Sequence, residues 1–322
     1  MADTQLPDKD HLPLKCPACG KGPSSFIFLA EPPEGGTARR FRVLRCSDCG
    51  SARTEIPPGT AEHQDLYFKD YWGAESDRAG GGLSHALTGI FLRQRVRAIS
   101  GELTKDSEVL DYGCGNGEFV GAMRAAGYNC YGFEPNSGLR SGHINSRVKD
   151  RTYDMVTLWH VFEHFTDPGG ELAGLAALLK PSGKIFLSVP NFQSADARLG
   201  GPLWFHLDVP RHACHYTQLG LERLIRRCGL KVISARKPFN WYAVFGMYQT
   251  LLNTSGCTTN ALYYWLKRGR SVYSRRSMAI AVKDALLHAV LAVPYLAAAF
   301  ALTAAVSLFG RAGSLEIICE KQ

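Results

Sequence analysis

Residues 107–118 of this chain read Ser-Glu-Val-Leu-Asp-Tyr-Gly-Cys-Gly-Asn-Gly-Glu. We expect an apolar strand to end at Asp111 and a helix to follow over Phe119 to Ala126. Between the two stand three glycines, Gly113, Gly115 and Gly117. Glycine tolerates positive φ and has no side chain, so a ligand can lie almost against the backbone there. The stretch therefore predicts a ligand-binding turn between a strand and a helix.

Residue 118 argues against a dinucleotide as that ligand. The G-x-G-x-x-G turn of dinucleotide sites needs a small residue three places after its second glycine, and this chain has Glu118 there. A carboxylate at a helix N-terminus repels a pyrophosphate, which free N–H groups and the positive end of the helix dipole normally bind. We therefore expect a nucleoside without phosphates.

A second acidic residue supports a nucleoside. The expected strand Asn129 to Phe133 is followed by Glu134. A β-α-β unit delivers a carboxylate to ribose hydroxyls at about this distance from the glycine turn.

These segments together resemble the class I S-adenosylmethionine (SAM) methyltransferases. Val109-Leu110-Asp111-Tyr112-Gly113-Cys114-Gly115-Asn116-Gly117 and Gly132-Phe133-Glu134-Pro135-Asn136 are similar to that family's cofactor motifs, and residues 153–164 resemble its fourth strand and following loop. The resemblance covers roughly residues 100–239 and the last strand. It implies SAM as cofactor, with the cofactor-binding residues Asp111, Gly113, Cys114, Gly115, Gly117, Glu134, Pro135 and Trp159.

The alternating strand and helix patterns predict an α/β fold with a mainly parallel sheet that is covered on both faces. By resemblance the sheet is Rossmann-like and seven-stranded, and only its last strand is antiparallel. One departure is the interval between Pro135 and Asp150, which is short for the helix and third strand that usually fit there. The contacts to the adenine therefore stay unassigned.

Four cysteines near the N-terminus form a metal-binding pattern. Cys16-Pro17-Ala18-Cys19-Gly20 and Cys46-Ser47-Asp48-Cys49-Gly50 are two C-x-x-C-G turns. Four thiolates make a closed tetrahedral site, which suits structural zinc and leaves no position for a reacting water. Two disulfides are the alternative, but nothing else in the sequence points to an oxidising compartment. Iron–sulfur binding fits the spacing less well.

The patterns divide the chain into four parts. We expect a zinc ribbon over residues 1–56, a linker and cofactor-covering helices over 57–100, the SAM-binding domain over 101–239 plus 312–322, and a helical apolar insertion over 240–311. In the second part Tyr67, Tyr71 and Trp72 either cover the cofactor or pack in the ordinary way.

Two histidine-rich stretches are candidates for the chemistry, because ligands in open α/β sheets lie beyond the carboxyl ends of the strands. The first holds His160, Glu163 and His164, with His160 as the preferred base or substrate contact. On its own His-Val-Phe-Glu-His also matches the H-x-x-E-H pattern of an inverted zinc protease. A strand beside a nucleoside turn is the wrong context for that enzyme.

The second stretch, residues 204–217, resembles the D-x-P-R-H-x-x-H-[FY]-T segment of methyltransferases associated with bacterial glycans and lipids. Arg211 could hold a phosphate or carboxylate, and His212 or His215 could serve as the base. The alternative is a hydrogen-bonded network that orders the loop.

Ala289 to Phe309 carries no charge and is long enough for a transmembrane helix. If the strands before and after the insertion share one sheet, however, both of its ends lie on the same side of any membrane, and a single crossing is impossible. We expect a platform on the membrane surface beside the pocket, and burial against the protein or a second subunit is the alternative. A basic run would face the headgroups: Lys267, Arg268, Arg270, Arg275, Arg276 and Lys283.

With 322 residues, 45% hydrophobic residues and a net charge of +8, the chain is globular and favours anionic partners. A polar N-terminus without a signal-peptide core predicts a cytoplasmic protein, peripheral or monotopic at the inner face of the membrane. We therefore expect methyl transfer from SAM to a glycan or lipid-linked acceptor. An RNA methyltransferase with a zinc ribbon, a soluble nucleotide-sugar C-methyltransferase and a non-catalytic scaffold are the alternatives. Nucleic acid is the less favoured partner, because the insertion is aromatic and apolar.

Overall fold

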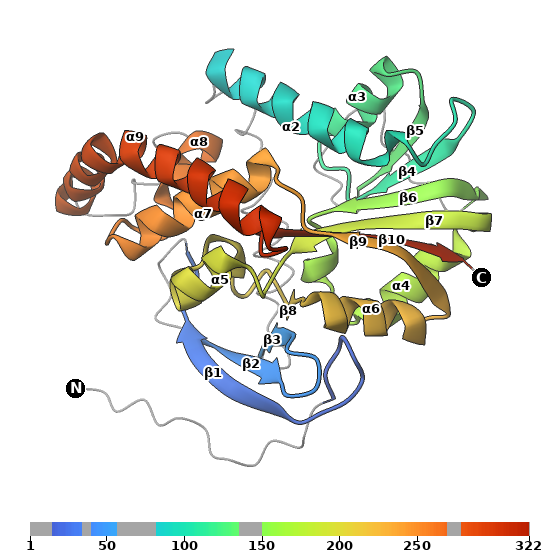
Figure 1. The fold of residues 1–322 in the computed structure, drawn as a ribbon, viewed down its shortest axis with the longest axis horizontal. Coiled ribbons are helices and arrows are strands. Elements are labelled where there is room, and N and C mark those ends of the chain that lie inside the picture. Colours follow the sequence, from blue (N-terminus) through green and yellow to red (C-terminus); the bar gives the residue numbers. More distant parts are fainter. Residues whose placement is uncertain (1–14, 34–39, 57–81, 135–149, 269–277, 322) are drawn as a thin grey trace.

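The computed structural model describes residues 15–33, 40–56, 82–134, 150–268 and 278–321. The expected roles of Tyr67, Tyr71, Trp72 and Pro135 lie outside these residues, as does the interval that was expected to be short of a third strand. The described residues form two sheets and the helices around them (Figure 1).

The strands are β1 (Ser24–Ala30), β2 (Phe41–Cys46), β3 (Ala52–Thr54), β4 (Glu108–Tyr112), β5 (Asn129–Phe133), β6 (Tyr153–Trp159), β7 (Leu179–Pro190), β8 (Cys214–His215), β9 (Leu230–Arg236) and β10 (Ser314–Lys321). The α-helices are α2 (Gly82–Ser100), α3 (Glu118–Ala125), α4 (Pro168–Ala177), α5 (Ala195–Gly200), α6 (Gln218–Arg227), α7 (Trp241–Thr254), α8 (Ala261–Arg268) and α9 (Met278–Leu308). Short 3₁₀ turns are η2 (Phe162–His164), η3 (Gly201–Leu203) and η4 (Phe205–Leu207).

The larger sheet has the strand order β5-β4-β6-β7-β10-β9. Strand β4 pairs in parallel with β5 and β6, and β6 pairs in parallel with β7. Strand β10 is antiparallel to both β7 and β9. The expected Rossmann-like sheet with an antiparallel last strand is confirmed, with six strands in the described part of the chain.

Helices cover both faces of this sheet, as a parallel sheet requires, because its strands are apolar on both sides. Adjacent residues of β6 show the two faces. Met155 packs with Ile99 of α2 and Met123 of α3, whereas Val156 belongs to the core that includes side chains of α4 and α6. Figure 1 shows the same arrangement, with α2 and α3 above the sheet and α4 and α6 below it.

Helix α6 begins directly after its capping residue, Thr217. The side chain of Thr217 accepts a hydrogen bond from Gly220 N (3.0 Å) and so satisfies one free N–H group of the first turn. Leu221, Leu224 and Ile225 are buried on one face of the helix. This capping residue also contacts the N-terminal segment, since its hydroxyl donates to Cys49 O (2.7 Å).

The smaller sheet has the order β1-β2-β3-β8, with antiparallel pairing throughout. Its first three strands come from the N-terminal cysteine-rich segment, but β8 belongs to the histidine-rich stretch 204–217. Ala52 and Arg53 of β3 face His215 and Cys214 of β8. The N-terminal segment is therefore joined to the rest of the chain by a shared sheet.

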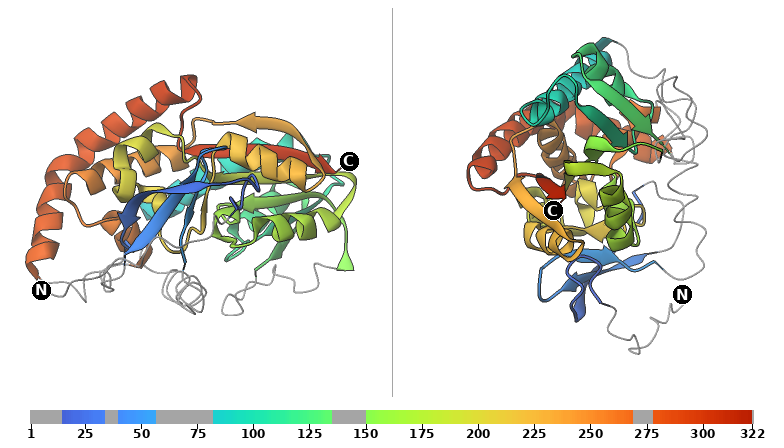
Figure 2. Two further views of the ribbon diagram at one scale, coloured as in Figure 1. Left: turned by 90° about the horizontal axis from the view of Figure 1, so that it is seen from below. Right: turned by 90° about the vertical axis from the view of Figure 1, so that its right-hand side faces the viewer.

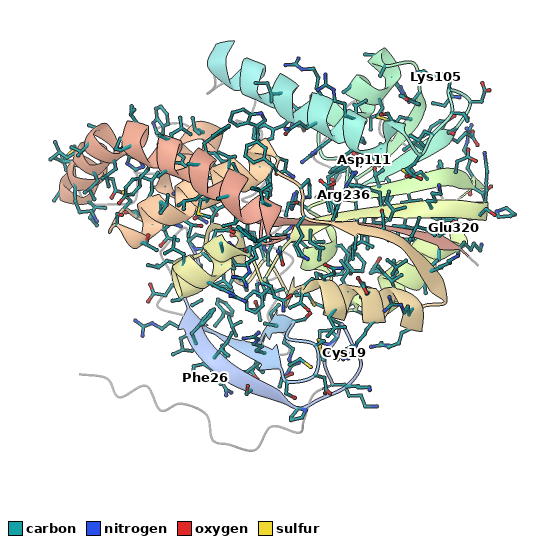
Figure 3. The ribbon with its side chains drawn as sticks, in the orientation of Figure 1. Cys19, Phe26, Lys105, Asp111, Arg236 and Glu320 are labelled. Atoms are coloured by element: carbon teal, nitrogen blue, oxygen red, sulfur yellow. The ribbon has the colours of Figure 1, made fainter. Side chains whose placement is uncertain are left out.

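The insertion leaves the sheet at the end of β9 and returns at the start of β10. Arg236 pairs with Glu316, so the two ends of the insertion are neighbours in the ladder. Ser314 pairs with Pro190, at the carboxyl end of β7. Both ends thus lie at the carboxyl edge of the parallel strands. In Figure 3, Asp111 and Arg236 lie toward this edge and Glu320 lies at the opposite end.

Helix α9 packs on α7 through an apolar cluster that includes Leu252 and Ala299, and the hydroxyls of Tyr295 and Ser255 are 2.7 Å apart. Figure 2 shows α9 at the end of the molecule away from the C-terminus. Most of its other apolar side chains are exposed, among them Val290 (71%) and Val293 (79%). In the described residues it is the one helix that is long and apolar enough to cross a membrane. Of the expected basic run, residues 270, 275 and 276 lie outside the described residues.

Candidate active site

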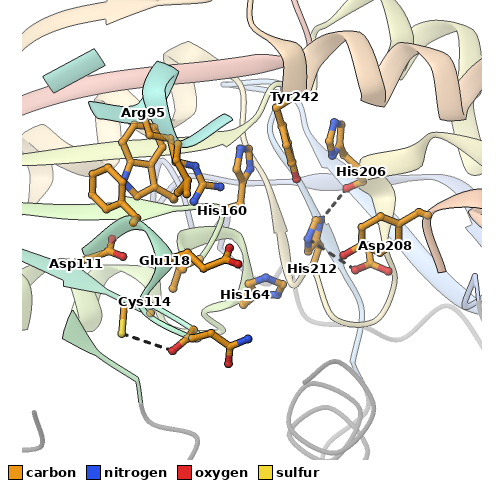
Figure 4. A pocket seen from close by; sticks show the side chains of 18 of the residues that line it. Arg95, Asp111, Cys114, Glu118, His160, His164, His206, Asp208, His212 and Tyr242 are labelled. Carbon is orange, nitrogen blue, oxygen red and sulfur yellow. Dashed lines mark hydrogen bonds and ion pairs between the residues drawn. The ribbon is translucent and has the colours of Figure 1, made fainter. Parts of the chain in front are cut away.

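A pocket lies at the carboxyl edge of the larger sheet (Figure 4). The glycine turn after β4 lines one part of it, and the loops after β6 and around η4 line another. Helices α2, α7 and α8 contribute the remaining walls, including Arg95 and Tyr242. The two histidine-rich stretches that the sequence singled out therefore meet the glycine turn across one cavity.

Asp111 occupies the end of β4 and lines the pocket. It is buried, and its Oδ1 accepts a hydrogen bond from Thr157 Oγ1 (2.9 Å) on the neighbouring strand β6. Burial raises the pKa of Asp111 to about 7, although the Thr157 hydrogen bond and the Arg95 guanidinium each lower it. A ligand that brings hydrogen-bond donors or a positive charge would stabilise the carboxylate form.

The glycine turn needs glycine for two different reasons. Gly113, Gly115 and Gly117 all have positive φ, at 80°, 53° and 78°, a region that side chains disfavour. At Gly113 space is also closed, because a Cβ there would lie 2.6 Å from Cγ2 of Val161. Gly113 and Cys114 donate their backbone N–H groups to Phe133 O (2.7 and 3.0 Å), which ties the turn to β5.

Glu134 points toward this turn. Its Oε2 accepts a hydrogen bond from Gly115 N (3.0 Å), and the side chain is buried. It is not among the residues that line the cavity, and neither is Gly117, whereas Gly113, Cys114 and Gly115 are. The carboxylate thus holds the backbone of the glycine turn in place.

Trp159, at the end of β6, lines the same part of the pocket. Its ring packs against Phe119 and Phe186, and the guanidinium of Arg95 lies over it at 5.2 Å from the centroid. Arg95 was missed by sequence reasoning. It lies on α2, which the sequence predicts as a helix without indicating which of its faces meets the pocket.

His160 follows β6 directly and lines the pocket. Its φ is +56°, a conformation that is uncommon outside glycine and that gathers at functional sites. The ring stacks on Tyr242, with 3.9 Å between centroids, and Nδ1 lies 3.5 Å from Glu163 Oε1. Burial, and then the charge of Arg95, hold the pKa of His160 well below its usual value. The ring is therefore neutral at pH 7.

His164 and His212 come from different loops and face the same cavity. His164 Nδ1 is 3.0 Å from Arg211 O, and His212 Nδ1 is 2.7 Å from His206 O. A carbonyl oxygen only accepts, so Nδ1 is the donor in both rings. Burial lowers the pKa of His164 to about 4 and also lowers the pKa of His212.

Arg211 and His215 lie outside the cavity. Arg211 is 1% exposed; its Nε donates to Asp208 Oδ2 (2.9 Å), and its Nη2 contacts Asp208 Oδ1 and the hydroxyl of Tyr264. This pairing fixes Asp208, which does line the pocket. His215 Nε2 meets Thr54 Oγ1 (3.0 Å) in the smaller sheet. The positions of Arg211 and His215 match the alternative interpretation, a hydrogen-bonded network that orders the loop.

Several lining residues had no signal in the sequence. Tyr242 of α7, Tyr263 and Tyr264 of α8 and the neighbouring Asn260 all come from the insertion. His206 and Asp208 lie in the stretch that was quoted as a motif but were not assigned a role. Both ends of the insertion lie at the carboxyl edge of the sheet. This position indicates that the insertion borders the pocket, but it does not indicate which residues line it.

The four cysteines of the N-terminal segment gather as expected. Cys16 Sγ and Cys49 Sγ are 3.7 Å apart, as are Cys19 Sγ and Cys46 Sγ. These separations are too long for disulfides, whose S–S bond is about 2.05 Å. Four sulfurs at ~2.3 Å from one ion in a tetrahedron lie about 3.8 Å apart. The arrangement therefore has the spacing of a four-thiolate metal site.

The cysteine site borders the loop that carries His212. Thr54 N donates to Ala213 O (3.0 Å), and Thr54 Oγ1 donates to His212 O (2.7 Å). Ser51 Oγ accepts from Thr217 N (3.0 Å). The backbone on both sides of β8 is thus held by residues that directly follow the second cysteine pair.

Comparison with known proteins places this architecture. Residues 87–235 match the family model described as a methyltransferase domain. A ubiquinone biosynthesis O-methyltransferase from Vibrio campbellii is 34% identical over an alignment of 126 residues. The alignment covers 33% of this chain and 53% of that protein. The protein of the same name from Escherichia fergusonii is 31% identical over 120 residues, 31% of this chain and 48% of that protein. The chain spans about half the length of these relatives.

Solved structures with a similar fold include a putative methyltransferase from Bacillus halodurans, with 14% identity, coverage of 71% of this chain and 98% of that one, and a TM-score of 0.43. A SAM-dependent methyltransferase from Archaeoglobus fulgidus has 18% identity, covers 71% of this chain and 93% of that one, and has a TM-score of 0.42.

The glycine turn provides a matched pair of substitutions. Gly113→Ala should lower the free energy of unfolding by about 1–3 kcal/mol, since it adds a Cβ at positive φ and against Val161. Gly121→Ala should raise it by up to about 1 kcal/mol, because that glycine lies inside α3 with open space around it. Urea unfolding measures both. Equal effects at the two positions would contradict the described turn.

Proposed function

We propose that this chain, in which residues 87–235 match a methyltransferase domain, is a class I SAM-dependent methyltransferase that transfers a methyl group from SAM to a hydroxyl of a glycan or lipid-linked acceptor at a membrane surface. The observation that carries the proposal is one cavity with a glycine turn and a buried acidic residue at one part and neutral imidazoles at another.

The residues around the turn fit the nucleoside part of SAM. Positive φ at Gly113, Gly115 and Gly117 favours residues without a side chain, so a ligand can approach the backbone of the turn. Asp111 faces the cavity, and Glu134 supports the turn through Gly115 N. When bound, SAM supplies an electrophilic methyl group on a positively charged sulfur, and the acidic residues favour that charge.

His160 is the candidate base. A hydroxyl nucleophile has to lose its proton during transfer, and a neutral imidazole at the cavity wall accepts one. The ring of Tyr242 stacks on it and restricts its orientation. Tyr242, Tyr263 and Phe205 surround this region with aromatic surface, which packs against an apolar acceptor and excludes water.

Two observations support the choice of acceptor. The names of the curated relatives specify transfer to oxygen. The exposed apolar surface of α9 belongs to the same insertion that supplies Tyr242 and Tyr263 to the pocket. A membrane-docked α9 would therefore bring a lipid-linked acceptor close to the cavity.

We further propose zinc as the ion of the four-cysteine site. The spacing of the sulfurs fits tetrahedral thiolate coordination, and a closed set of four thiolates serves structure and not catalysis. Its task would be to hold β3, and through β3 the loop with His212.

SAM binding tests the cofactor assignment. Calorimetry should detect SAM binding to the full chain, and Glu134→Gln should weaken it by about ten- to a hundredfold, the effect of losing a charged hydrogen-bond acceptor. Glu102→Gln is the control, because Glu102 forms a surface ion pair with Lys184 outside the pocket. A chain with intact metal content that binds no SAM would instead be a scaffold.

Metal removal tests the structural role of the cysteines. Cys46→Ser should lower the free energy of unfolding by at least about 3 kcal/mol, a fraction of the ~10–16 kcal/mol that zinc binding supplies in small domains. Cys228→Ser should have a small effect, since Cys228 is half-buried and outside the cluster. Zinc analysis and urea unfolding of both variants decide the matter, and unchanged stability without zinc would refute the role.

Membrane docking is tested by flotation with anionic vesicles. Val290→Glu combined with Val293→Glu should reduce the vesicle-bound fraction more than tenfold, because each charge costs about 2.5 kcal/mol or more in an apolar phase. Leu219→Glu is the matched control, because Leu219 is an exposed apolar residue on α6, outside α9. Point changes are preferable to deleting residues 240–311, which would also remove walls of the pocket. Equal flotation of all forms would exclude docking through α9.

A further inference from the structure

Glu163 is a buried acidic residue next to the pocket. Its side chain is 1% exposed, and within the described residues neither carboxylate oxygen accepts a hydrogen bond. The nearest cationic candidates are ring nitrogens, His160 Nδ1 at 3.5 Å and His212 Nε2 at 3.9 Å from Oε1. Buried carboxylates are stabilised by a paired charge or by a metal ion, so this group calls for a cation that protein residues supply incompletely.

Two histidines next to Glu163 have the tautomer that metal ligands need. The Nδ1 atoms of His164 and His212 donate to the backbone carbonyls of Arg211 and His206. Nε2 of each neutral ring therefore carries the lone pair. A backbone carbonyl that fixes the other ring nitrogen is the usual outer-shell partner of a metal-bound histidine.

The three side chains converge. One ligand atom from each of Glu163, His164 and His212 lies within 4.8 Å of the others. Both histidines line the cavity, whereas Glu163 lies behind its wall. Figure 4 shows His164 and His212 across the cavity from Asp111 and Cys114. An ion held by the three would keep its remaining coordination positions open toward the cavity, as catalytic metal sites do.

We propose that Glu163, His164 and His212 bind a divalent transition-metal ion that holds the acceptor hydroxyl in the pocket. Two imidazoles and one carboxylate suit Zn²⁺, Fe²⁺, Mn²⁺ or Co²⁺. The role as acceptor ligand rests on the proposed methyl transfer; the site itself does not. It differs from the H-x-x-E-H protease pattern, because His212 from a separate loop takes the place of His160.

The metal would act on the acceptor and not on the cofactor. A divalent ion lowers the pKa of a bound hydroxyl and fixes the oxygen in position. Asp208, which Arg211 holds 3.9 Å from His212 Nε2, adds negative charge beside the ion.

Cobalt titration of the metal-free full chain, without SAM or acceptor, tests the site. We expect two equivalents of Co²⁺ to bind: one with thiolate charge-transfer bands, from the cysteines, and one with only weak visible bands, from nitrogen and oxygen ligands. Glu163→Gln and His212→Asn should weaken the second equivalent by at least about tenfold, the lower end of what losing even an outer-shell partner costs, and leave the first unchanged.

His288→Gln is the matched control. His288 also pairs Nδ1 with a backbone carbonyl, that of Asp284 (2.6 Å), and its Nε2 has no hydrogen-bond partner among the described residues. It lies on α9, outside the cluster. It should bind both equivalents like the wild type. Circular dichroism checks the fold of each variant, and the wild-type stoichiometry decides the question even if a variant does not fold.

A wild-type chain that binds only the thiolate-type equivalent would overturn the site, and so would undiminished binding of the second equivalent by folded Glu163→Gln. Failure of methyl transfer is a separate result. A chain that binds both cobalt equivalents but transfers no methyl group refutes the proposed function and leaves the metal site standing.

Discussion

Two short strands, β3 and β8, exchange backbone hydrogen bonds, and the architecture of the pocket depends on that pairing. Strand β8 lies within the histidine-rich stretch 204–217. Thr54 of β3 donates a hydrogen bond to the carbonyl of His212 in the same stretch. The same stretch also packs on the N-terminal segment, because Trp204, Leu207 and Val209 share an apolar cluster with side chains of β2 and β3. The four-cysteine cluster lies in the same N-terminal segment as β3. That segment therefore helps to position a loop from a different part of the sequence.

The pocket combines groups that ordinary packing would avoid. His160 and Asp208 have positive φ, at 56° and 36°, and buried polar side chains meet around Glu163. Such features cost stability and persist where function needs them. Burial keeps the imidazoles of His160 and His164 neutral, and the Arg211 guanidinium helps to hold the pKa of Asp208 well below its usual range. The pocket thus offers both the lone pairs of neutral imidazoles and the fixed negative charge of Asp208.

Sequence reasoning predicted the sheet and the glycine turn that lines the pocket, because both depend on local patterns. The glycines, Asp111 and Glu134 follow directly from strand ends and turn geometry. It could not assign Arg95 or Tyr242, since a helical pattern does not say which distant element faces a helix. His215 shows the opposite case. A motif suggested chemistry for this histidine, and in the fold its Nε2 lies 3.0 Å from Thr54 Oγ1 of β3. This contact depends on the pairing of strands far apart in sequence, which no local pattern indicates.

The antiparallel neighbours β9 and β10 have one more consequence. Arg236 and Glu316 face each other across the ladder, so a tight hairpin of a few residues could join these strands in place of α7, α8 and α9. The sheet therefore does not require the insertion in order to connect β9 to β10. Because the insertion also supplies aromatic walls of the cavity, replacing it would change the surface of the pocket while the sheet beneath stays the same.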